Sequence, residues 1–275
     1  MRLAVAYSTR DPVGKAASRL LVELAGGEEA ECPGAVECYR LSTGAYLAGF
    51  NEDVVELEMI GETPDPGAEA VVVLSRHRAE SGRKSLTVHH TGNPGKAAYG
   101  GEPGTLSISY PALSRLLLQK YREKAEEAGI AGEYSIVLEA THHGPTSPGR
   151  PLVFIEVGST PEEWRDTRAL RAMAETVLEA LKGEPPMCKP AAGFGGTHYP
   201  EKFTRIHLEG EYCLGHIIPK YAFQQGVEAS VIVQAVEKTY PQPAEVALIE
   251  KKSLKSSHKK LIEQVLGSRV EILKV

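Results

Sequence analysis

Hydrophobic positions along the chain follow two kinds of pattern. Short runs rich in Val, Ile and Leu have the length of β-strands, and they cover 3–6, 70–74, 86–88, 135–138, 152–157 and 246–249. Between them, hydrophobic residues recur with the period of an amphipathic helix over 13–24, 111–128, 162–182 and 257–266. Strands that alternate with helices predict an α/β protein, with a mostly parallel or mixed sheet flanked by helices.

Two segments interrupt this alternation. Residues 91–104 are rich in Gly and Pro, and residues 183–219 form the second interruption. We expect both to be extended loops or a small extra subdomain. No internal repeat or low-complexity linker divides the rest of the chain, so the predicted organisation is a single domain over 1–275.

The composition is that of an ordinary globular protein. The 275 residues are 42% hydrophobic and 24% charged, which excludes a wholly disordered, collagen-like or coiled-coil chain. No apolar run approaches the roughly 18 residues that cross a bilayer, so we expect a cytoplasmic protein that does not bind membranes. The four cysteines show no C-x-x-C spacing, and we expect them to be reduced thiols: Cys32, Cys38, Cys188 and Cys213.

Charge is distributed unevenly along the sequence. The formal net charge is -5, but residues 20–69 contain twelve acidic residues and one basic residue, whereas residues 251–275 contain seven basic and two acidic ones. The sequence therefore predicts one acidic face and one basic face. The negative total does not exclude a nucleic-acid partner.

Histidines follow three of the predicted strands. They are His77, the pair His89 and His90, and the pair His142 and His143. In open α/β sheets, ligands bind outside the carboxyl ends of the strands, so we expect these strands to bring histidines together at one edge. On an extended chain, adjacent side chains point to opposite sides, so we expect only one ring of each pair to face the centre.

A histidine cluster of this kind favours activation of water. Histidines with one or two carboxylates suit Zn²⁺, whose catalytic sites use three protein ligands and keep a position open for water. Without a metal, one imidazole would act as the general base. The sequence has no H-E-x-x-H motif and no G-x-S-x-G elbow, and no cysteine has a neighbouring sequence that suggests activation. Metal-activated and histidine-activated water both stay open.

A glycine-rich segment at 193–199 is neither a P-loop nor a dinucleotide-binding motif. Gly195 and Gly196 would let backbone N–H groups approach a phosphate or a developing oxyanion. A tight turn explains the glycines equally well.

Lysines accumulate where the predicted helix over 257–266 begins, with Ser257 as its expected N-cap. A helix N-terminus flanked by lysines suits phosphate groups, and a solvated lysine-rich face is the alternative. The predicted phosphate-binding residues are Lys202, Lys220, Lys251, Lys252, Lys255, Lys259 and Lys260. Aromatic residues are only 6% of the chain, which argues against a stacking platform for long single strands.

Several motifs together resemble one enzyme family. They are S-R-H at 75–77, L-T-x-H-x-T-G-N at 86–93, E-A-T-H-H-G-P-T at 139–146, F-I-E-x-G-S at 154–159, E-W at 163–164, G-G-x-H-Y at 195–199 and G-H-I-x-P-K-Y at 215–221. In combination they resemble the archaeal-type D-aminoacyl-tRNA deacylases over nearly the whole chain. The strings at 139–146 and 215–221 are the most specific.

This resemblance implies hydrolysis of the ester that joins a D-amino acid, D-tyrosine among others, to the 3′ end of tRNA. It also implies a zinc-dependent enzyme, tRNA as the partner, and an α/β fold related to peptidyl-tRNA hydrolase and the phosphorylase-like group. Two alternatives are a metal-dependent hydrolase of a small amide or ester metabolite without an RNA partner, and a non-catalytic tRNA-binding protein. We expect a monomer without a protein partner.

Under this hypothesis, site residues can be assigned. The predicted catalytic residues are His77, His89, His142, His143, His198 and Glu139. The predicted zinc ligands are His89, His142, His143 and Glu156, with Glu139 and Glu156 as alternative partners that orient an imidazole. The predicted oxyanion donors are the backbone N–H groups around Gly195 and Gly196.

Overall fold

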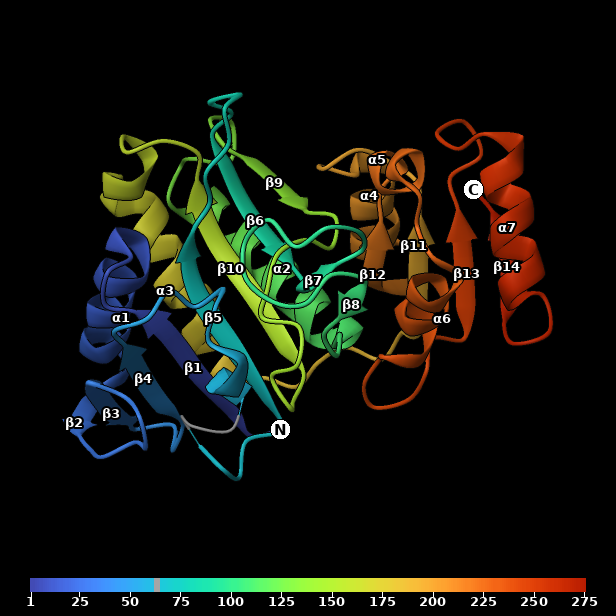
Figure 1. Ribbon diagram of the computed structural model, residues 1–275. Coiled ribbons are helices and arrows are strands. Elements are labelled where there is room, and N and C mark those ends of the chain that lie inside the picture. The colour runs from blue at the N-terminus through green and yellow to red at the C-terminus, as the bar shows by residue number, and fades with distance from the viewer. Residues whose placement is uncertain (62–64) are drawn as a thin grey trace.

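Two main β-sheets lie side by side in the described chain, and helices pack on both (Figure 1). A third sheet contains only the two short strands β7 (Gly92–Asn93) and β8 (Thr105–Leu106). The computed structural model describes residues 1–61 and 65–275. Within these residues, the larger sheet has the order β2-β3-β4-β1-β5-β10-β6-β9, and the smaller sheet has the order β12-β11-β13-β14. The predicted α/β class with a mixed sheet flanked by helices is confirmed.

The strands of the larger sheet are β1 (Leu3–Ser8), β2 (Gly27–Glu29), β3 (Glu37–Leu41), β4 (Tyr46–Phe50), β5 (Ala70–Arg76), β6 (Ser85–His89), β9 (Ser135–Leu138) and β10 (Leu152–Gly158). Those of the smaller sheet are β11 (Lys189–Phe194), β12 (Tyr212–Ile218), β13 (Val246–Ile249) and β14 (Glu271–Lys274).

Strand direction changes across the larger sheet. β4, β1, β5 and β10 are parallel neighbours, whereas β6 is antiparallel to β10 and β9 is parallel to β6. The carboxyl ends of β6 and β9 therefore lie at the opposite end of the strands from the carboxyl end of β5. The prediction that these three strands deliver histidines to a single edge is wrong, because the antiparallel pairing of β6 reverses two of them.

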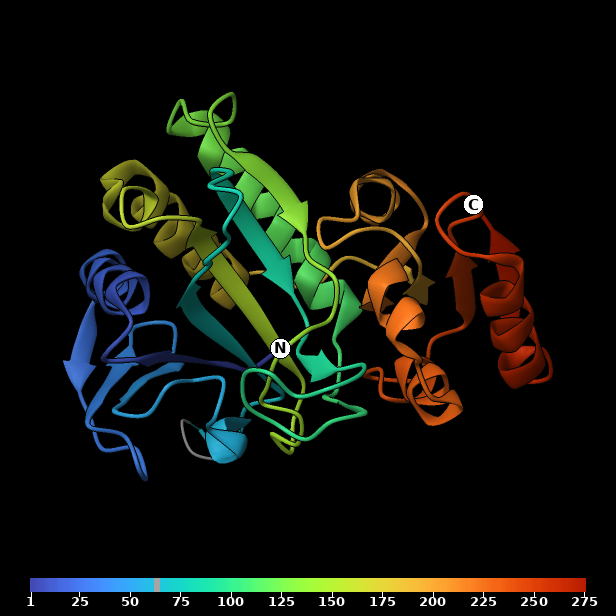
Figure 2. The same cartoon turned by 45° about the horizontal axis from the view of Figure 1, so that its top comes forward.

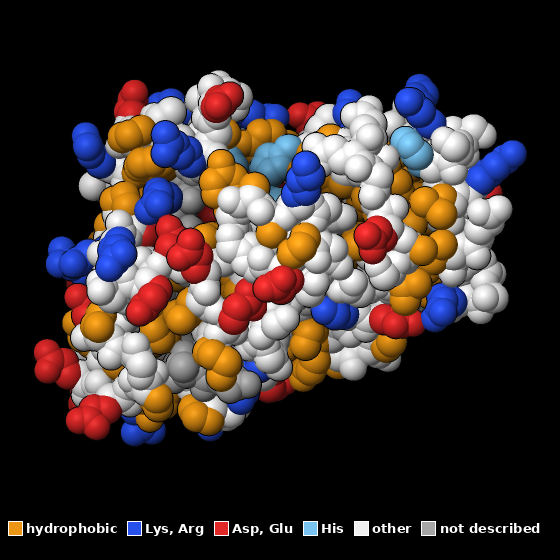
Figure 3. Space-filling view, in the orientation of Figure 1, with side chains coloured by type: hydrophobic (Ala, Val, Ile, Leu, Met, Phe, Trp, Pro, Cys, Tyr) orange, Lys and Arg blue, Asp and Glu red, His pale blue; other side chains and the backbone are white. Residues whose placement is uncertain are grey.

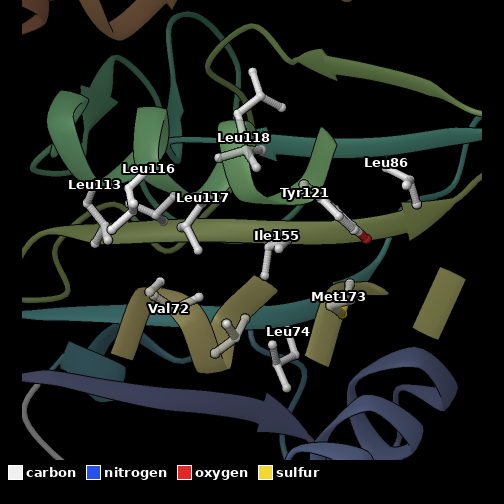
Figure 4. Close-up of a cluster of buried hydrophobic side chains, with 14 of the residues drawn as sticks. Val72, Leu74, Leu86, Leu113, Leu116, Leu117, Leu118, Tyr121, Ile155 and Met173 are labelled. Carbon is white, nitrogen blue, oxygen red and sulfur yellow. The ribbon is translucent and has the colours of Figure 1, made fainter. Parts of the chain in front are cut away.

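Three helices cover one face of the larger sheet. They are α1 (Pro12–Ala25), α2 (Pro111–Glu127) and α3 (Thr167–Lys182), and Figures 1 and 2 show them side by side. Leu117 and Met173 of these helices belong to one buried cluster with Val72 and Ile155 of the sheet (Figure 4). Complete burial of such a side chain contributes about 1.5–3 kcal/mol. Alternation along β5 and β10 thus assigns every second side chain to the helical face.

Loops and a short 3₁₀ helix, η1 (Glu58–Gly61), cover the opposite face of the larger sheet. Val73 and Phe154 of the sheet pack there with Val54 and Ile60. This face becomes polar further along β10 and β6, and that polar part contains the site described below.

Segment 183–219 forms regular structure rather than extended loops. It supplies β11, β12 and a helix between them, and all neighbouring strands of the smaller sheet are parallel. Ala191 and Leu214 on one face of this sheet share a hydrophobic cluster with α2, while Phe194 and Ile249 on the other face pack in a second cluster. Segment 91–104 is mostly loop, with β7 (Gly92–Asn93) at its start. The helices of this half are α4 (Glu201–Glu209), α5 (Lys220–Gln225), α6 (Ala229–Glu237) and α7 (Ser256–Leu266).

Two helix starts differ from prediction. The helix predicted over 162–182 divides into a 3₁₀ helix, η2 (Glu163–Arg165), and α3, because Asp166 is extended and its side chain accepts a hydrogen bond from the Arg168 N–H. α7 has Lys255 at its N-cap position, so Ser257 is not the cap. Among the described residues, no helix has both the length and the apolar character needed to span a membrane.

The cysteines are paired, contrary to the prediction of reduced thiols. Disulfides join Cys32 to Cys38 and Cys188 to Cys213, each with a Cα–Cα distance of 5.8 Å. Cys188 directly precedes β11, and Cys213 lies in the adjacent strand β12. The strand pairing therefore brings together two residues whose separation in sequence conceals their proximity.

Two histidines are buried in the neutral form at the junction between α2 and the smaller sheet. Nδ1 of His207 accepts a hydrogen bond from the Leu214 N–H, and Arg115 donates to the His207 carbonyl. Nε2 of His216 donates to the Ser107 carbonyl. Burial lowers the pKa of His207 to about 3 and that of His216 to about 4. Both contribute stability that is complete above pH 6.5 and is lost as the pH falls toward these values.

His207→Asn removes one titrating ring and keeps an acceptor near the position of Nδ1. Between pH 8 and pH 5, the free energy of unfolding of the wild type should fall by about 2 kcal/mol more than that of the variant, since one pKa unit corresponds to about 1.4 kcal/mol. Urea unfolding at the two pH values measures this difference. An equal fall in both proteins would contradict a neutral, buried His207.

Candidate active site

A polar patch occupies part of the loop-covered face of the larger sheet. The register of β6 and β10 places Phe154 opposite His89 and Glu156 opposite Thr87. Side chains two residues apart on one strand share a face, and so do side chains directly opposite each other on paired strands. Glu156 and His89 therefore lie on the same face of the sheet as the apolar Phe154. The candidate site therefore lies on a sheet face, not in a crevice beyond the strand ends.

The chain that follows β9 crosses from the larger sheet to the smaller one, directly over this patch. Ala140 N–H donates to the His198 carbonyl at 2.9 Å, and Thr141 N–H donates to the Ile217 carbonyl at 2.9 Å. Gly92 N–H donates to the His143 carbonyl at 2.7 Å. These bonds hold Glu139, His142 and His143 against residues from both sheets.

Two buried carboxylates form the centre of the patch. Nε2 of His198 lies 2.7 Å from Glu139 Oε2, and the Glu139 side chain is 0% exposed. Burial opposes ionisation, but His77 and His198 outweigh it and hold the pKa of Glu139 well below its usual value. Burial also opposes ionisation of Glu156, but the hydrogen bond with His77 and the nearby His89 imidazole lower its pKa to about 2. Both acids are therefore ionised at neutral pH.

His77 connects the two acids. Its Nδ1 lies 3.1 Å from Glu139 Oε1 and 3.2 Å from Glu156 Oε2, and its Nε2 lies 2.6 Å from the Tyr199 hydroxyl. Burial lowers the pKa of His77, but the two carboxylates raise it far more, to about 12. The two carboxylates thus favour the protonated imidazole at neutral pH, which makes His77 a poor acceptor for a proton from water.

Three further histidines meet beside this network. The ring centroids of His89 and His142 are 4.4 Å apart, as are those of His142 and His143. One possible ligand atom of each of the three residues lies within 4.8 Å of the others. Burial lowers the pKa of His142 well below its usual value and that of His143 to about 4, so both rings are neutral.

Backbone carbonyl oxygens fix the tautomers of these rings. Nδ1 donates to Ala140 O in His142 at 2.8 Å, to Gly144 O in His143 at 2.6 Å, and to His90 O in His89 at 3.3 Å. In each ring, Nε2 is then the nitrogen left to bind a ligand. Nε2 of His89 is buried and has no hydrogen-bond partner among the described residues. Both oxygens of Glu139 are also buried without a hydrogen bond of good geometry, although the His198 ring forms a close ion-pair contact with one of them.

His142 and His143 both face this cluster, contrary to the expectation for an extended chain. His143 has φ 45°, a left-handed conformation that costs a non-glycine residue roughly 1–2 kcal/mol. The turn brings the two adjacent rings to the same side. His89 and His90 do point to opposite sides, as predicted: His90 is buried, accepts from the Tyr110 N–H and donates to the Gly215 carbonyl.

Comparison with known proteins identifies the family. The sequence model described as D-aminoacyl-tRNA deacylase matches residues 65–272. The chain belongs to the D-aminoacyl-tRNA deacylase family.

Three relatives in this deacylase family are similar over most of their length. A protein of Aeropyrum pernix is 53% identical over 99% of this chain and 100% of its own length, and one of Hyperthermus butylicus is 47% identical over 86% and 88%. A protein of Staphylothermus marinus is 40% identical over 98% and 97%. All three are named D-aminoacyl-tRNA deacylase. None of these names supports the alternative of a hydrolase for small metabolites.

A crystal structure also shares the fold. The conserved protein of unknown function AF0625 is 32% identical, with a TM-score of 0.91 over 99% of this chain and 95% of that protein. The arrangement of both sheets is therefore that of an experimentally observed structure.

Gly195 and Gly196 of this deacylase-family chain do not present free N–H groups. Gly195 N–H donates to the Ile218 carbonyl at 2.8 Å, and Gly196 N–H donates to Ser253 Oγ at 2.9 Å. Their φ values are 112° and 78°, and a Cβ on Gly195 would collide with Ser253. The glycines serve a tight turn, and the prediction that they form the oxyanion hole is wrong for this conformation, because both donors are occupied.

The predicted lysines divide into two groups. Lys202, Lys220 and Lys252 line a groove of about 590 Å³ with Tyr199 and Arg83, which places this groove next to His77. Lys251 lines the adjoining hollow. Lys255, Lys259 and Lys260, on and just before α7, are absent from the lining of both.

Acidic and basic side chains are mixed over most of the face in Figure 3, so this view does not show the predicted division into one acidic and one basic face. Figure 3 shows histidines in a hollow on the upper part of the molecule with Lys and Arg nearby, and acidic residues on the lower left, over the end formed by β2 and β3. One part of the acidic segment nevertheless approaches the site. Glu58 accepts hydrogen bonds from the N–H groups of Thr146 and Ser147, three and four residues after His143.

Two functional candidates escaped the sequence prediction. Tyr199 bonds His77, and Tyr221 Oη lies 3.4 Å from His198 Nδ1. Both tyrosines lie in the motifs at 195–199 and 215–221 that resemble the deacylase family. That resemblance was the only sequence signal for them.

Proposed function

We propose that this protein hydrolyses the ester between a D-amino acid and the 3′ end of tRNA, which frees the tRNA for correct charging. This proposal rests on the proximity of two features: a buried carboxylate–imidazole network and a lysine-lined groove. Tyr199 contacts the first and lines the second. The first suits activation of water, and the second suits the phosphates of an acceptor end. The family name is that of the same reaction class. With such a substrate, we expect the protein to act in the cytoplasm, as a monomer without a protein partner.

We further propose that His89, His142 and His143 hold Zn²⁺ through their Nε2 atoms. Backbone carbonyls orient all three rings for this purpose, and the buried Nε2 of His89 has no hydrogen-bond partner among the described residues. Glu156, which the sequence also indicated as a ligand, bonds His77 and lies 3.7 Å from His89 Nε2, so we assign it an orienting role. When bound, Zn²⁺ would lower the pKa of water and polarise the ester carbonyl.

His198 is the imidazole best placed to act as the general base. Its side chain is 33% exposed, which is more than the other imidazoles that contact Glu139. Because Nε2 points at Glu139, Nδ1 is the nitrogen that would take the proton of the attacking water, which would replace its 3.4 Å contact with Tyr221 Oη. His77 is a poor base here, since the two acids favour its protonated form. It stabilises negative charge in the site instead.

The reaction is tested with matched substrates. Purified protein should release tyrosine from D-tyrosyl-tRNA much faster than from L-tyrosyl-tRNA, and exhaustive chelation should abolish the release. Free amino acid is measured by chromatography. Equal rates on the two isomers, or no release, would refute the deacylase activity, whereas full activity after chelation would refute only the role of zinc.

His143→Ala should lose bound zinc, because it removes one of three convergent ligands, and kcat should fall roughly 10²-fold or more. Metal content after dialysis is measured by elemental analysis, so the result does not depend on activity. His258→Ala, on α7, serves as the control and should retain its zinc. Equal zinc content in both variants would show that the ion binds elsewhere.

Binding of tRNA should depend on the groove lysines and not on those of α7. Replacement of Lys202, Lys220 and Lys252 by Ala should reduce the slope of log affinity against log salt concentration by about 2, since each contact to a single strand contributes about 0.7. The control replaces Lys255, Lys259 and Lys260 and changes the net charge equally. The same slope change in both triple variants would indicate non-specific attraction.

A further inference from the structure

Tyr199 lies between the acid network and the groove. It occupies the loop after β11, half-buried, with its ring edge against His77 at a centroid distance of 5.7 Å and against His198 at 5.1 Å. Its hydroxyl is 2.6 Å from Nε2 of His77, and its side chain also lines the lysine groove. One residue therefore touches both halves of the proposed site.

The hydrogen bonds of His77 set the direction of this contact. Nδ1 lies 3.1 Å from a Glu139 oxygen and 3.2 Å from a Glu156 oxygen, and these two negative charges raise the pKa of the ring and favour a proton on both nitrogens. Nε2–H then donates to the Tyr199 oxygen. A phenol has one proton of its own, and no acceptor for it is found among the described residues. That O–H is free to donate to a molecule in the groove.

The surroundings of Tyr199 favour donation. The Arg83 guanidinium lies 5.3 Å from the centre of its ring, and Lys220 lines the same groove. With Lys202 and Lys252, these cations outnumber the two acids of the groove, Glu201 and Glu250, and they attract an anionic molecule to the phenol.

The position of the groove indicates which substrate atom would receive the proton of the Tyr199 hydroxyl. If the lysines hold the phosphates of the acceptor end, the group between those phosphates and His198 is the terminal ribose, whose ester oxygen is the leaving group. Resting on the function proposed above, we propose that Tyr199 is a catalytic residue that protonates this ribose oxygen as the ester bond breaks.

The step balances without any further reactant. Water oxygen bonds to the ester carbonyl carbon, and its proton passes to His198. The bond between that carbon and the ribose oxygen then breaks, the electron pair stays on the ribose oxygen, and the Tyr199 proton joins it. Solvent restores the proton of Tyr199, and His198 releases its proton to solvent. The products are the free amino acid and a ribose hydroxyl.

The test is Tyr199→Phe, which removes the hydroxyl and keeps the ring. With D-tyrosyl-tRNA, kcat should fall roughly 10²-fold while KM stays within a few-fold, because the change removes an interaction made in the transition state. Tyr212→Phe, at the start of β12, is the matched control and should have wild-type kinetics. Unchanged kcat in Tyr199→Phe beside an active wild type would overturn the role of Tyr199 alone, whereas an inactive wild type would overturn the deacylase function itself.

A second substrate pair separates catalysis from a structural effect. The ethyl ester of D-tyrosine needs protonation of its leaving oxygen, and the trifluoroethyl ester needs it far less. The defect of Tyr199→Phe should be large on the first ester and should shrink to a few-fold on the second. An equal defect on both esters would show that Tyr199 only supports the position of His77, and would overturn the proposal.

Discussion

The pairing of Glu139 and Glu156 with a single imidazole, that of His77, is the interaction on which the site depends. Both carboxylates are withdrawn from water on a sheet face that is otherwise packed with apolar side chains. A buried carboxylate without a partner costs several kcal/mol, so this face tolerates two acids only with cations between them. The ion pairs with His77 therefore also keep both acids of the site ionised.

The reversal of β6 explains how partners reach these acids from two directions. His77 approaches from the end of β5, and His89 approaches from the end of β6 at the opposite edge. Glu156 lies between them on β10, with one oxygen toward each. In a wholly parallel sheet, the residues after both strands would meet beyond one edge. The antiparallel strand moves the centre onto the face, where the smaller sheet covers it from the side.

Sequence patterns predict the regular parts of this structure well and its long-range parts poorly. The strands at 70–74 and 152–157 and the helix at 111–128 form near their predicted bounds, because one-sided burial imposes a local period. β11 and β12 were missed, since Pro190 and Gly215 weaken the strand pattern. No local signal reports the direction of β6, which depends on its partner β10, or the pairing of Cys188 with Cys213.

The site shows the same division. Residue types and strand ends indicated histidines and acids that the fold brings together. The left-handed turn at His143 has no sequence marker, and it brings two adjacent rings to face one centre. One overlooked signal was present. In S-L-T-V-H at 85–89, every second residue is polar, as in a strand with one apolar and one polar face. That pattern alone would have moved the predicted site from the sheet edge to its surface.

The division of the site between two sheets has a consequence during synthesis of the protein on the ribosome. His77, His89, Glu139 and Glu156 all precede residue 159, whereas His198 and Tyr199 follow β11. Synthesis runs from the N-terminus, so the larger sheet is complete while Glu139 still lacks the imidazole that will lie 2.7 Å away. The network around Glu139, including the His198 imidazole, is therefore assembled only when the last third of the chain has docked.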